Sequence, residues 1–200
     1  PPPHLPSRRQ RQMCIRDRGS IEAVDDRAFF NEGSILNSDD LINSLNGVNT
    51  VIHLAAFKSA GESMDNPQKY SENNVIGSKR LLGAMNEKNV KNIIFSSSAA
   101  VYGTPEYLPL DEKHPLKPIN HYGYTKLQTE KTIDMYGNEG LISYANLRYF
   151  NAAGYDRRGK IRTKEQNPAN LIPSIMEVAA GKRDKSVSYT HLTLPTTRHV

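Results

Sequence analysis

Short apolar runs alternate with helix-like segments through the middle of the chain, and this alternation restricts the fold more than any other feature. Residues 50–54 (TVIHL) and 92–95 (NIIF) are compact runs that suit strands covered on both faces. Between them, Asn66 followed by Pro67 predicts a helix start. Strands and helices alternating at this spacing require right-handed crossovers and so predict an α/β fold with a parallel, doubly wound sheet. The expected strands are 27–32, 50–54, 92–95 and 141–149, and the expected helices are 39–45, 67–88, 121–136 and 173–180.

Small and polar residues gather at the ends of three expected strands. Residues 55–58 (AAFK) follow the second strand, residues 96–98 (SSS) follow the third, and residues 148–151 (RYFN) close the fourth. Ligands of a doubly wound sheet bind outside the carboxyl ends of its strands. These three clusters therefore predict a binding site at one edge of the sheet.

A tyrosine and a lysine four residues apart mark the expected helix 121–136. The segment YGYTK places Tyr122 and Lys126 on one helix face, whereas Tyr124 points elsewhere. An ammonium beside a phenol stabilises the phenolate, which lowers the phenol pKa from about 10 toward the range of a general base. The pair alone is weak evidence, because a chain with 10 tyrosines contains such spacings by chance. The serine cluster adds weight, because its hydroxyls can hydrogen-bond a ligand beside the phenol.

The charge distribution separates the two ends of the chain from its middle. The net charge is +5, but five arginines and one aspartate lie in residues 1–18 and one arginine lies in residues 186–200. This leaves residues 19–185 neutral, which argues against a nucleic-acid partner. We expect residues 1–18 and 187–200 to be foreign or disordered segments; a basic arm for an acidic partner is the alternative. No apolar run is long enough to span a membrane, and the single cysteine, Cys14, is consistent with a cytoplasmic protein.

Several segments carry a family signature in order along the chain. They are VIHLAAFKSAGES (51–63), ENNVIGS (72–78), SSSAAVYG (96–103), the YxxxK spacing, LRYFNAAG (147–154), and NPANLIP with VAAGKRDK between 167 and 185. Together they resemble the extended short-chain dehydrogenase/reductase family and, within it, the UDP-glucose 4-epimerases. The resemblance covers about residues 20–185. It implies a Rossmann-like NAD-binding domain over residues 19–155 and the start of a substrate domain over residues 156–186.

The resemblance also implies roles for individual residues. Ser98, Tyr122 and Lys126 match the family's catalytic positions, with Tyr122 as the base, Lys126 as the group that lowers its pKa, and Ser98 as a bridge to the sugar hydroxyl. The implied reaction interconverts UDP-glucose and UDP-galactose by transient oxidation at sugar C4 with bound NAD. The implied NAD contacts are Ile35, Leu54, Ala55, Ala56, Phe57, Lys58, Asn73, Ser98, Tyr122, Lys126 and Phe150. The implied substrate contacts are Ser98, Tyr122, Asn151 and Asn170.

Alternatives remain for the function and for single positions. Related dehydratases carry an acidic pair where this chain has Ala99 and Ala100, so dehydration is not expected. Other NAD-dependent nucleotide-sugar epimerases or decarboxylases remain open, as does a non-catalytic nucleotide-binding module. The two alanines after the second strand could serve packing alone, and Asn73 could be a surface residue. His53 is expected to be a satisfied core histidine, and no His, Cys and Asp cluster has the spacing of a metal site.

The glycine-rich turn that binds the NAD pyrophosphate in this family has no counterpart in the chain. None of the 13 glycines forms GxGxxG or GxxGxxG, and Ser34 stands where the family usually has an aspartate before Ile35. We therefore expect a fragment that lacks the first strand–turn–helix unit, is inactive as it stands, and leaves a central strand edge unpaired. The resemblance implies a homodimer of the full-length protein, formed by helices 67–88 and 121–136.

Overall fold

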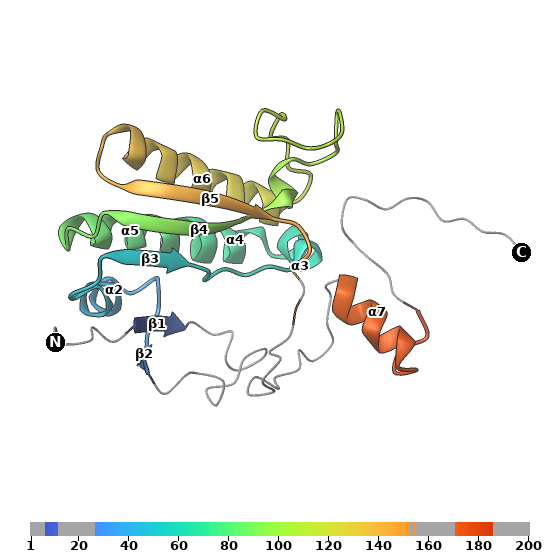
Figure 1. Cartoon of the computed structure of the whole chain (residues 1–200), viewed down its shortest axis with the longest axis horizontal. Coiled ribbons are helices and arrows are strands. Elements are labelled where there is room, and N and C mark those ends of the chain that lie inside the picture. The colour runs from blue at the N-terminus through green and yellow to red at the C-terminus, as the bar shows by residue number, and fades with distance from the viewer. Residues whose placement is uncertain (1–6, 12–26, 153, 155–170, 186–200) are drawn as a thin grey trace, which may run out of the picture.

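A computed structural model describes residues 7–11, 27–152, 154 and 171–185, and the strands among them form two parallel sheets (Figure 1). The smaller sheet pairs β1 (Ser7–Arg11) with β2 (Ala28–Glu32). The larger sheet has the order β3 (Thr50–His53), β4 (Asn92–Ser98) and β5 (Ser143–Tyr149). Because both of its strand pairs are parallel, the carboxyl ends of its strands lie at one edge, as predicted. The predicted α/β, Rossmann-like class is confirmed.

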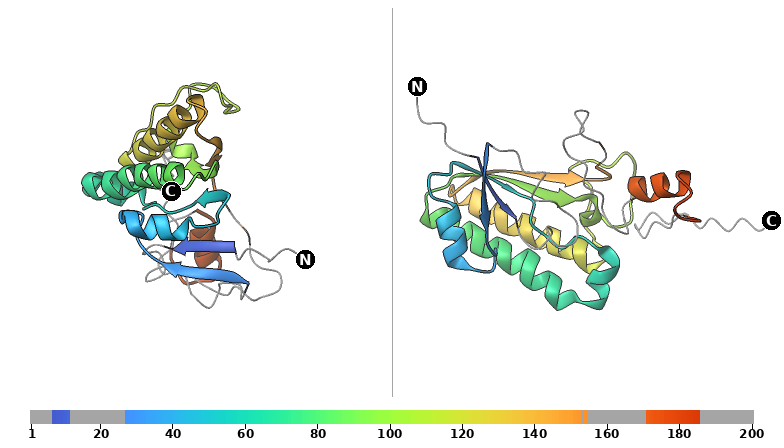
Figure 2. Two further views of the ribbon diagram at one scale, coloured as in Figure 1. Left: turned by 90° about the vertical axis from the view of Figure 1, so that its left-hand side faces the viewer. Right: turned by 90° about the horizontal axis from the view of Figure 1, so that it is seen from below.

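The helices of the described residues fall where the sequence predicts helices, with two additions. They are α2 (Ser38–Ser44), α3 (Ala60–Asp65), α4 (Pro67–Tyr70), a π-helical segment (Ser71–Ile76), α5 (Gly77–Glu87), a short 3₁₀ turn (Ala99–Val101), α6 (His121–Asn138) and α7 (Leu171–Ala179). The additions are α3 and the 3₁₀ turn. The helices α2, α5 and α6 lie on one face of the larger sheet, as both views in Figure 2 show.

Side-chain caps fix where two of these helices begin. The Asn37 side chain accepts hydrogen bonds from the backbone N–H groups of Asp39 and Asp40 at the start of α2. The Asn120 side chain accepts from Gly123 N at 2.8 Å at the start of α6. Such caps satisfy N–H groups that have no partner within the helix. The end of α6 is followed by Gly140, which has φ +69°.

Three local predictions need correction. The helix expected over residues 67–88 is continuous in space, but residues 71–76 adopt π-helical hydrogen bonding, which a 3.6-residue period does not reveal. The strand expected to end at residue 95 continues to Ser98, so the serines form the strand end rather than the loop after it. Residues 7–11 form β1, although we expected no regular structure in residues 1–18.

The core lies between the larger sheet and the helices on its face. Its largest fully buried apolar side chains come from α2, α5, β4 and α6: Leu41, Leu82, Met85, Ile93, Phe95 and Ile133. The opposite face of the sheet is open in the described part of the chain, where Ile52 on β3 is 63% exposed and Leu147 on β5 is 38% exposed. Among the described residues β3 pairs with β4 alone.

Candidate active site

The predicted catalytic residues meet where the carboxyl end of β4 faces the first turns of α6. The Nζ atom of Lys126 lies 5.8 Å from the centroid of the Tyr122 ring, so the two side chains share one helix face. Ser98 is the last residue of β4, and its hydroxyl lies near enough to the Tyr122 phenol to lower the pKa of that phenol. Tyr124 points away: it is 46% exposed, and its ring packs beside that of His121. The structure therefore brings Ser98, Tyr122 and Lys126 together.

Gly123 permits the close contact between α6 and this strand end. A Cβ atom at Gly123 would lie 2.4 Å from the carbonyl oxygen of Ala100, closer than side-chain carbons come to backbone oxygen. Only glycine avoids this clash without a shift of the backbone. The residue beside the tyrosine thus sets how near the phenol can come to Ser98.

Lys126 is a buried cation whose amine points at β4. It is 4% exposed, donates a hydrogen bond to the carbonyl oxygen of Ser96 at 2.7 Å, and lies 4.9 Å from the centroid of the Phe95 ring. Burial lowers the Lys126 pKa from 10.5 to about 8, while the negative charge of Glu130 acts in the opposite direction. The side chain therefore remains mostly protonated at neutral pH.

The pKa of Tyr122 corrects one part of the sequence prediction. Burial of the phenol raises this pKa above its usual value, and only the hydrogen bond from Ser98 acts to lower it. The prediction that Lys126 brings about a net lowering was wrong in direction. The physical reason is that the loss of water around the phenolate outweighs an ammonium that is turned toward the Ser96 carbonyl.

The loop after β3 is held by an asparagine that the sequence analysis did not single out. Asn74 is 2% exposed, and its side chain accepts a hydrogen bond from Phe57 N at 2.9 Å and donates one to Phe57 O at 3.0 Å. It also donates to the Thr125 hydroxyl at 3.1 Å, which joins this loop to α6. The predicted Asn73 lies half-buried beside it and donates to the Asn74 side-chain oxygen.

The remaining predicted contacts are spread over several environments. Ile35 is 2% exposed and packs in the core against Gly77, so its side chain does not reach the strand ends. Ala55 and Ala56 are half-buried, whereas Leu54 and Lys58 are exposed. Phe150 is 60% exposed with its ring 6.5 Å from that of Tyr102, and Asn151 is exposed. Asn170 lies outside the described residues.

His53 has the environment of a core histidine, as predicted. It is 4% exposed, and burial together with the nearby charge of Lys126 lowers its pKa to about 3. Because the Ser78 hydroxyl donates to Asn74 O, the Nε2–H of neutral His53 donates to Ser78 Oγ at 2.8 Å. The described residues contain no group of three His, Cys, Asp or Glu side chains placed to hold a metal ion. No helix among them is long and apolar enough to cross a membrane.

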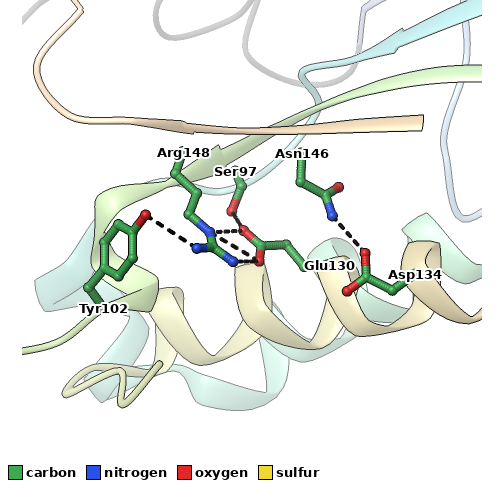
Figure 3. Close-up of polar contacts among 6 residues, drawn as sticks. All are labelled: Ser97, Tyr102, Glu130, Asp134, Asn146 and Arg148. Atoms are coloured by element: carbon green, nitrogen blue, oxygen red, sulfur yellow. Dashed lines mark hydrogen bonds and ion pairs between the residues drawn. The ribbon is translucent and has the colours of Figure 1, made fainter. Parts of the chain in front are cut away.

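A buried ion pair beside the catalytic residues was missed by the sequence analysis (Figure 3). Glu130 on α6 is 2% exposed and pairs with Arg148 on β5 at 2.8 Å. Ser97 donates a hydrogen bond to the same carboxylate, and Arg148 donates to the Tyr102 hydroxyl at 3.2 Å. One signal was available in the sequence: Glu130 follows Lys126 by four residues and so shares its helix face.

Sequence comparison places the chain in a family. The sequence profile of the NAD dependent epimerase/dehydratase family matches residues 4–194 of this chain. The chain belongs to this family. The match reaches beyond residues 20–185 at both ends, so the expectation that the two end segments are foreign gains no support from it.

Several similar members of the family are UDP-glucose 4-epimerases. That of Halalkalibacterium halodurans is 42% identical over 179 residues, which cover 87% of this chain and 53% of the relative. That of Lactobacillus helveticus is 42% identical over 80% of this chain and 49% of its own length. The crystal structure of the Brucella ovis enzyme in complex with NAD matches with a TM-score of 0.74 and 42% identity, over 78% of this chain and 49% of that one. The chain thus spans about half the length of the curated relatives it matches.

Proposed function

We propose that this chain carries the catalytic residues of an enzyme that interconverts UDP-glucose and UDP-galactose with NAD. The observation that carries the proposal is the meeting of Ser98, Tyr122 and Lys126 at one strand end in a member of this family. The relatives supply the substrate class, because those at 42% identity are named UDP-glucose 4-epimerases.

The groups at the strand ends suit part of an NAD molecule. The half-buried Ala55 and Ala56 let a ligand approach the backbone closely, and the exposed Lys58 offers a cation for a phosphate. The protonated amine of Lys126 suits the hydroxyls of a ribose. Asn73, Phe150, Ser98 and Tyr122 complete the proposed side-chain contacts. Ile35 and Leu54 are proposed to contribute through their backbone, since the Ile35 side chain is in the core. Phe57 is proposed to contribute through its side chain, because its peptide groups are already held by Asn74.

The chemistry assigned to this chain is proton transfer at the sugar 4-hydroxyl. NAD, when bound, supplies a ring that accepts the C4 hydride and returns it. Tyr122, as a phenolate, takes the 4-hydroxyl proton while C4 is oxidised and gives it back when C4 is reduced, so no proton is consumed overall. Ser98 stabilises the phenolate by its hydrogen bond, and Lys126 adds a positive charge on the same helix face. Asn151 and Asn170 are proposed to hold the UDP-sugar.

Several features of the whole protein belong to the same proposal. They are a Rossmann-like domain over residues 19–155 and the start of a substrate domain over residues 156–186. A homodimer of the full-length enzyme and a cytoplasmic location are proposed on the resemblance alone.

The proposal is tested in a chimaera, in which a full-length relative provides the parts of the enzyme that lie outside residues 20–185. Residues 20–185 replace the matching segment of the Halalkalibacterium halodurans enzyme, and UDP-galactose turnover is measured with and without Tyr122→Phe. We expect turnover by the chimaera and a loss of about 10²–10⁴-fold in the variant, because the phenol is the proton acceptor. Tyr124→Phe is the matched control, since it removes a hydroxyl two residues away on the exposed side of α6.

Two outcomes would contradict these proposals. Equal rates for the chimaera and its Tyr122→Phe variant would favour a non-catalytic nucleotide-binding module. Micromolar NAD binding by the 200-residue chain alone, measured by calorimetric titration, would refute the expectation that the chain is inactive as it stands.

A further inference from the structure

The short helix α3, which the sequence analysis did not predict, lies against the first turn of α6. Both helices begin at the edge where the strands of the larger sheet end, as Figure 1 shows. The first N–H groups of a helix have no partner within it, so each needs one from elsewhere. In α6 these are the N–H groups of His121, Tyr122 and Gly123. Their partners determine how the turn that carries the proposed base is held.

Ser63 on α3 provides the partner of the Tyr122 N–H group. The two residues are 59 positions apart in the sequence, yet Tyr122 N donates a hydrogen bond to Ser63 Oγ at 2.9 Å. Ser63 is fully buried, and its own hydroxyl proton is donated to Ala60 O at 2.6 Å. The hydroxyl therefore cannot turn without weakening one of its bonds, and no water reaches it to replace a bond that is lost.

The N–H groups on either side of Tyr122 have weaker or more local partners. His121 N lies 3.4 Å from the sulfur of Met64, and a thioether is a weak acceptor. Gly123 N donates to the side chain of Asn120, the cap residue of α6 itself, at 2.8 Å. Of these three N–H groups, that of Tyr122 is the one that joins the first turn of α6 to α3 through a strong acceptor.

The carbonyl group of Tyr122 is held by a side chain as well. Thr125 is fully buried, and its hydroxyl donates to Tyr122 O at 2.7 Å. The same hydroxyl accepts from the side chain of Asn74 at 3.1 Å. Asn74 in turn holds both Phe57 peptide groups. The backbone of Tyr122 is therefore tied to the segment after β3 twice, once through α3 and once through Thr125.

We propose that Ser63 is the positioning residue of Tyr122: its hydroxyl holds the first turn of α6 so that the phenol stays beside the strand end that carries Ser98. The inference rests on the proposed function only for the role of Tyr122 as the base. The geometry that carries it is the direct hydrogen bond from the Tyr122 N–H to a fully buried serine that is itself fixed by a second bond. Reactions between bound groups depend steeply on position, because a misplacement of about 1 Å can cost about 10²-fold in rate.

The hydrogen bond is tested in the 200-residue chain, with no need for activity. The chain is labelled with ¹⁵N-tyrosine, the Tyr122 amide signal is assigned from its absence in Tyr122→Phe, and amide hydrogen exchange is followed by NMR. In Ser63→Ala we expect the Tyr122 amide to exchange about 5–10-fold faster, which is the effect of losing one net hydrogen bond. The amide of Tyr136, within the same helix, is the internal reference and should keep its rate. An unchanged Tyr122 rate in a folded Ser63→Ala variant would overturn the proposal.

The consequence for catalysis is tested in the chimaera with UDP-galactose. Ser63→Ala should lower kcat by about 10-fold and leave KM unchanged, because the base moves while the substrate contacts do not. Ser63→Thr keeps the hydroxyl and should recover most of the lost rate. Ser44→Ala is the matched control, since Ser44 is a buried serine of α2 that donates to Asp40 O at 2.7 Å and accepts from Asn31 Nδ2 at 2.9 Å. It should leave kcat unchanged.

A further variant keeps the test decisive if Ser63→Ala does not fold. Ser63→Cys fills the space of the hydroxyl, but a thiol is a weak acceptor, so kcat should again fall with KM unchanged. A wild-type kcat in a folded Ser63→Ala or Ser63→Cys variant, or an equal loss in Ser44→Ala, would overturn the positioning role. Absence of turnover by the unmutated chimaera would instead contradict the proposed function, and the exchange rate of the Tyr122 amide would still decide whether Ser63 holds it.

Discussion

Adding one methyl group at Gly123 should force the first turn of α6 away from the strand end that carries Ser98. The new Cβ atom would lie 2.4 Å from Ala100 O and 3.0 Å from both Ala100 C and the Pro118 ring. These neighbours are backbone and ring atoms, which cannot rotate out of the way. Overpacking of this kind costs about 1–3 kcal/mol. An alanine in a helix gains up to about 1 kcal/mol over glycine, so we expect a net loss of about 1–2 kcal/mol in Gly123→Ala.

The same substitution at Gly83 provides a control of opposite sign. Gly83 lies within α5, and a Cβ atom there would meet nothing within 4 Å. Gly83→Ala should therefore raise the free energy of unfolding by up to about 1 kcal/mol. Urea unfolding followed by circular dichroism measures both variants in the 200-residue chain. If Gly123→Ala proved as stable as Gly83→Ala, the close contact between α6 and Ala100 would not exist in the protein.

Two further substitutions test the buried polar groups of the site. The Lys126 pKa of about 8 in the fold is below its value of 10.5 in the unfolded chain, so the unfolded chain binds more protons between these pH values. Wild-type stability should therefore rise relative to Lys126→Met by up to about 3 kcal/mol between pH 7.5 and 10, measured as the difference in unfolding free energy. Asn74→Ala would leave both Phe57 peptide groups without their partner and should cost about 2–4 kcal/mol in urea unfolding, because each lost bond leaves a polar group unsatisfied. The control, Asn73→Ala, removes a single hydrogen bond to Asn74 and should cost less than about 1.5 kcal/mol. Similar losses of unfolding free energy in Asn73→Ala and Asn74→Ala would contradict the assignment of Asn74 as the residue that holds the loop after β3.

The elements of the fold could be predicted where a short sequence pattern is sufficient to specify them. The apolar runs beginning at Thr50 and Asn92 specify β3 and β4, because each is compact and bounded by polar residues. Pro67 marks the start of α4, since its ring favours the first turn of a helix. The four-residue spacing of Tyr122 and Lys126 is likewise local, and the structure places both on one face.

The role of Asn74 could not be predicted from the sequence, since Asn73 was named as a cofactor contact on the family resemblance and nothing pointed to Asn74 as the residue that holds the loop after β3. An ordinary helical period was assumed there, but π-helical hydrogen bonds over Ser71–Ile76 change the angle between successive side chains. Asn74 is therefore the residue directed at the Phe57 peptide groups. Nothing in the residue types of this segment indicates a π-helix.

The direction of the Tyr122 pKa shift was also beyond the sequence. Spacing shows that a cation is near, but it does not show where the amine points or how much water the phenol loses. In the structure the amine donates to Ser96 O, and the Tyr122 side chain is half-buried. The direction of a pKa shift depends on the combined effects of burial, charges and hydrogen bonds around the group, whereas a sequence motif specifies only one neighbouring residue.

The polar character of α6 explains why its position matters so much to this site. Along its buried face, Thr125, Lys126, Thr129 and Glu130 outnumber the buried apolar Leu127 and Ile133. Each of the four makes a hydrogen bond, and those of Lys126 and Glu130 reach the strands that end at the site. A helix held in this way pays a desolvation cost for every polar group, so it is stable only when nearly all bonds form at once. Small displacements of α6 are therefore disfavoured, and Tyr122 stays beside the strand end that carries Ser98.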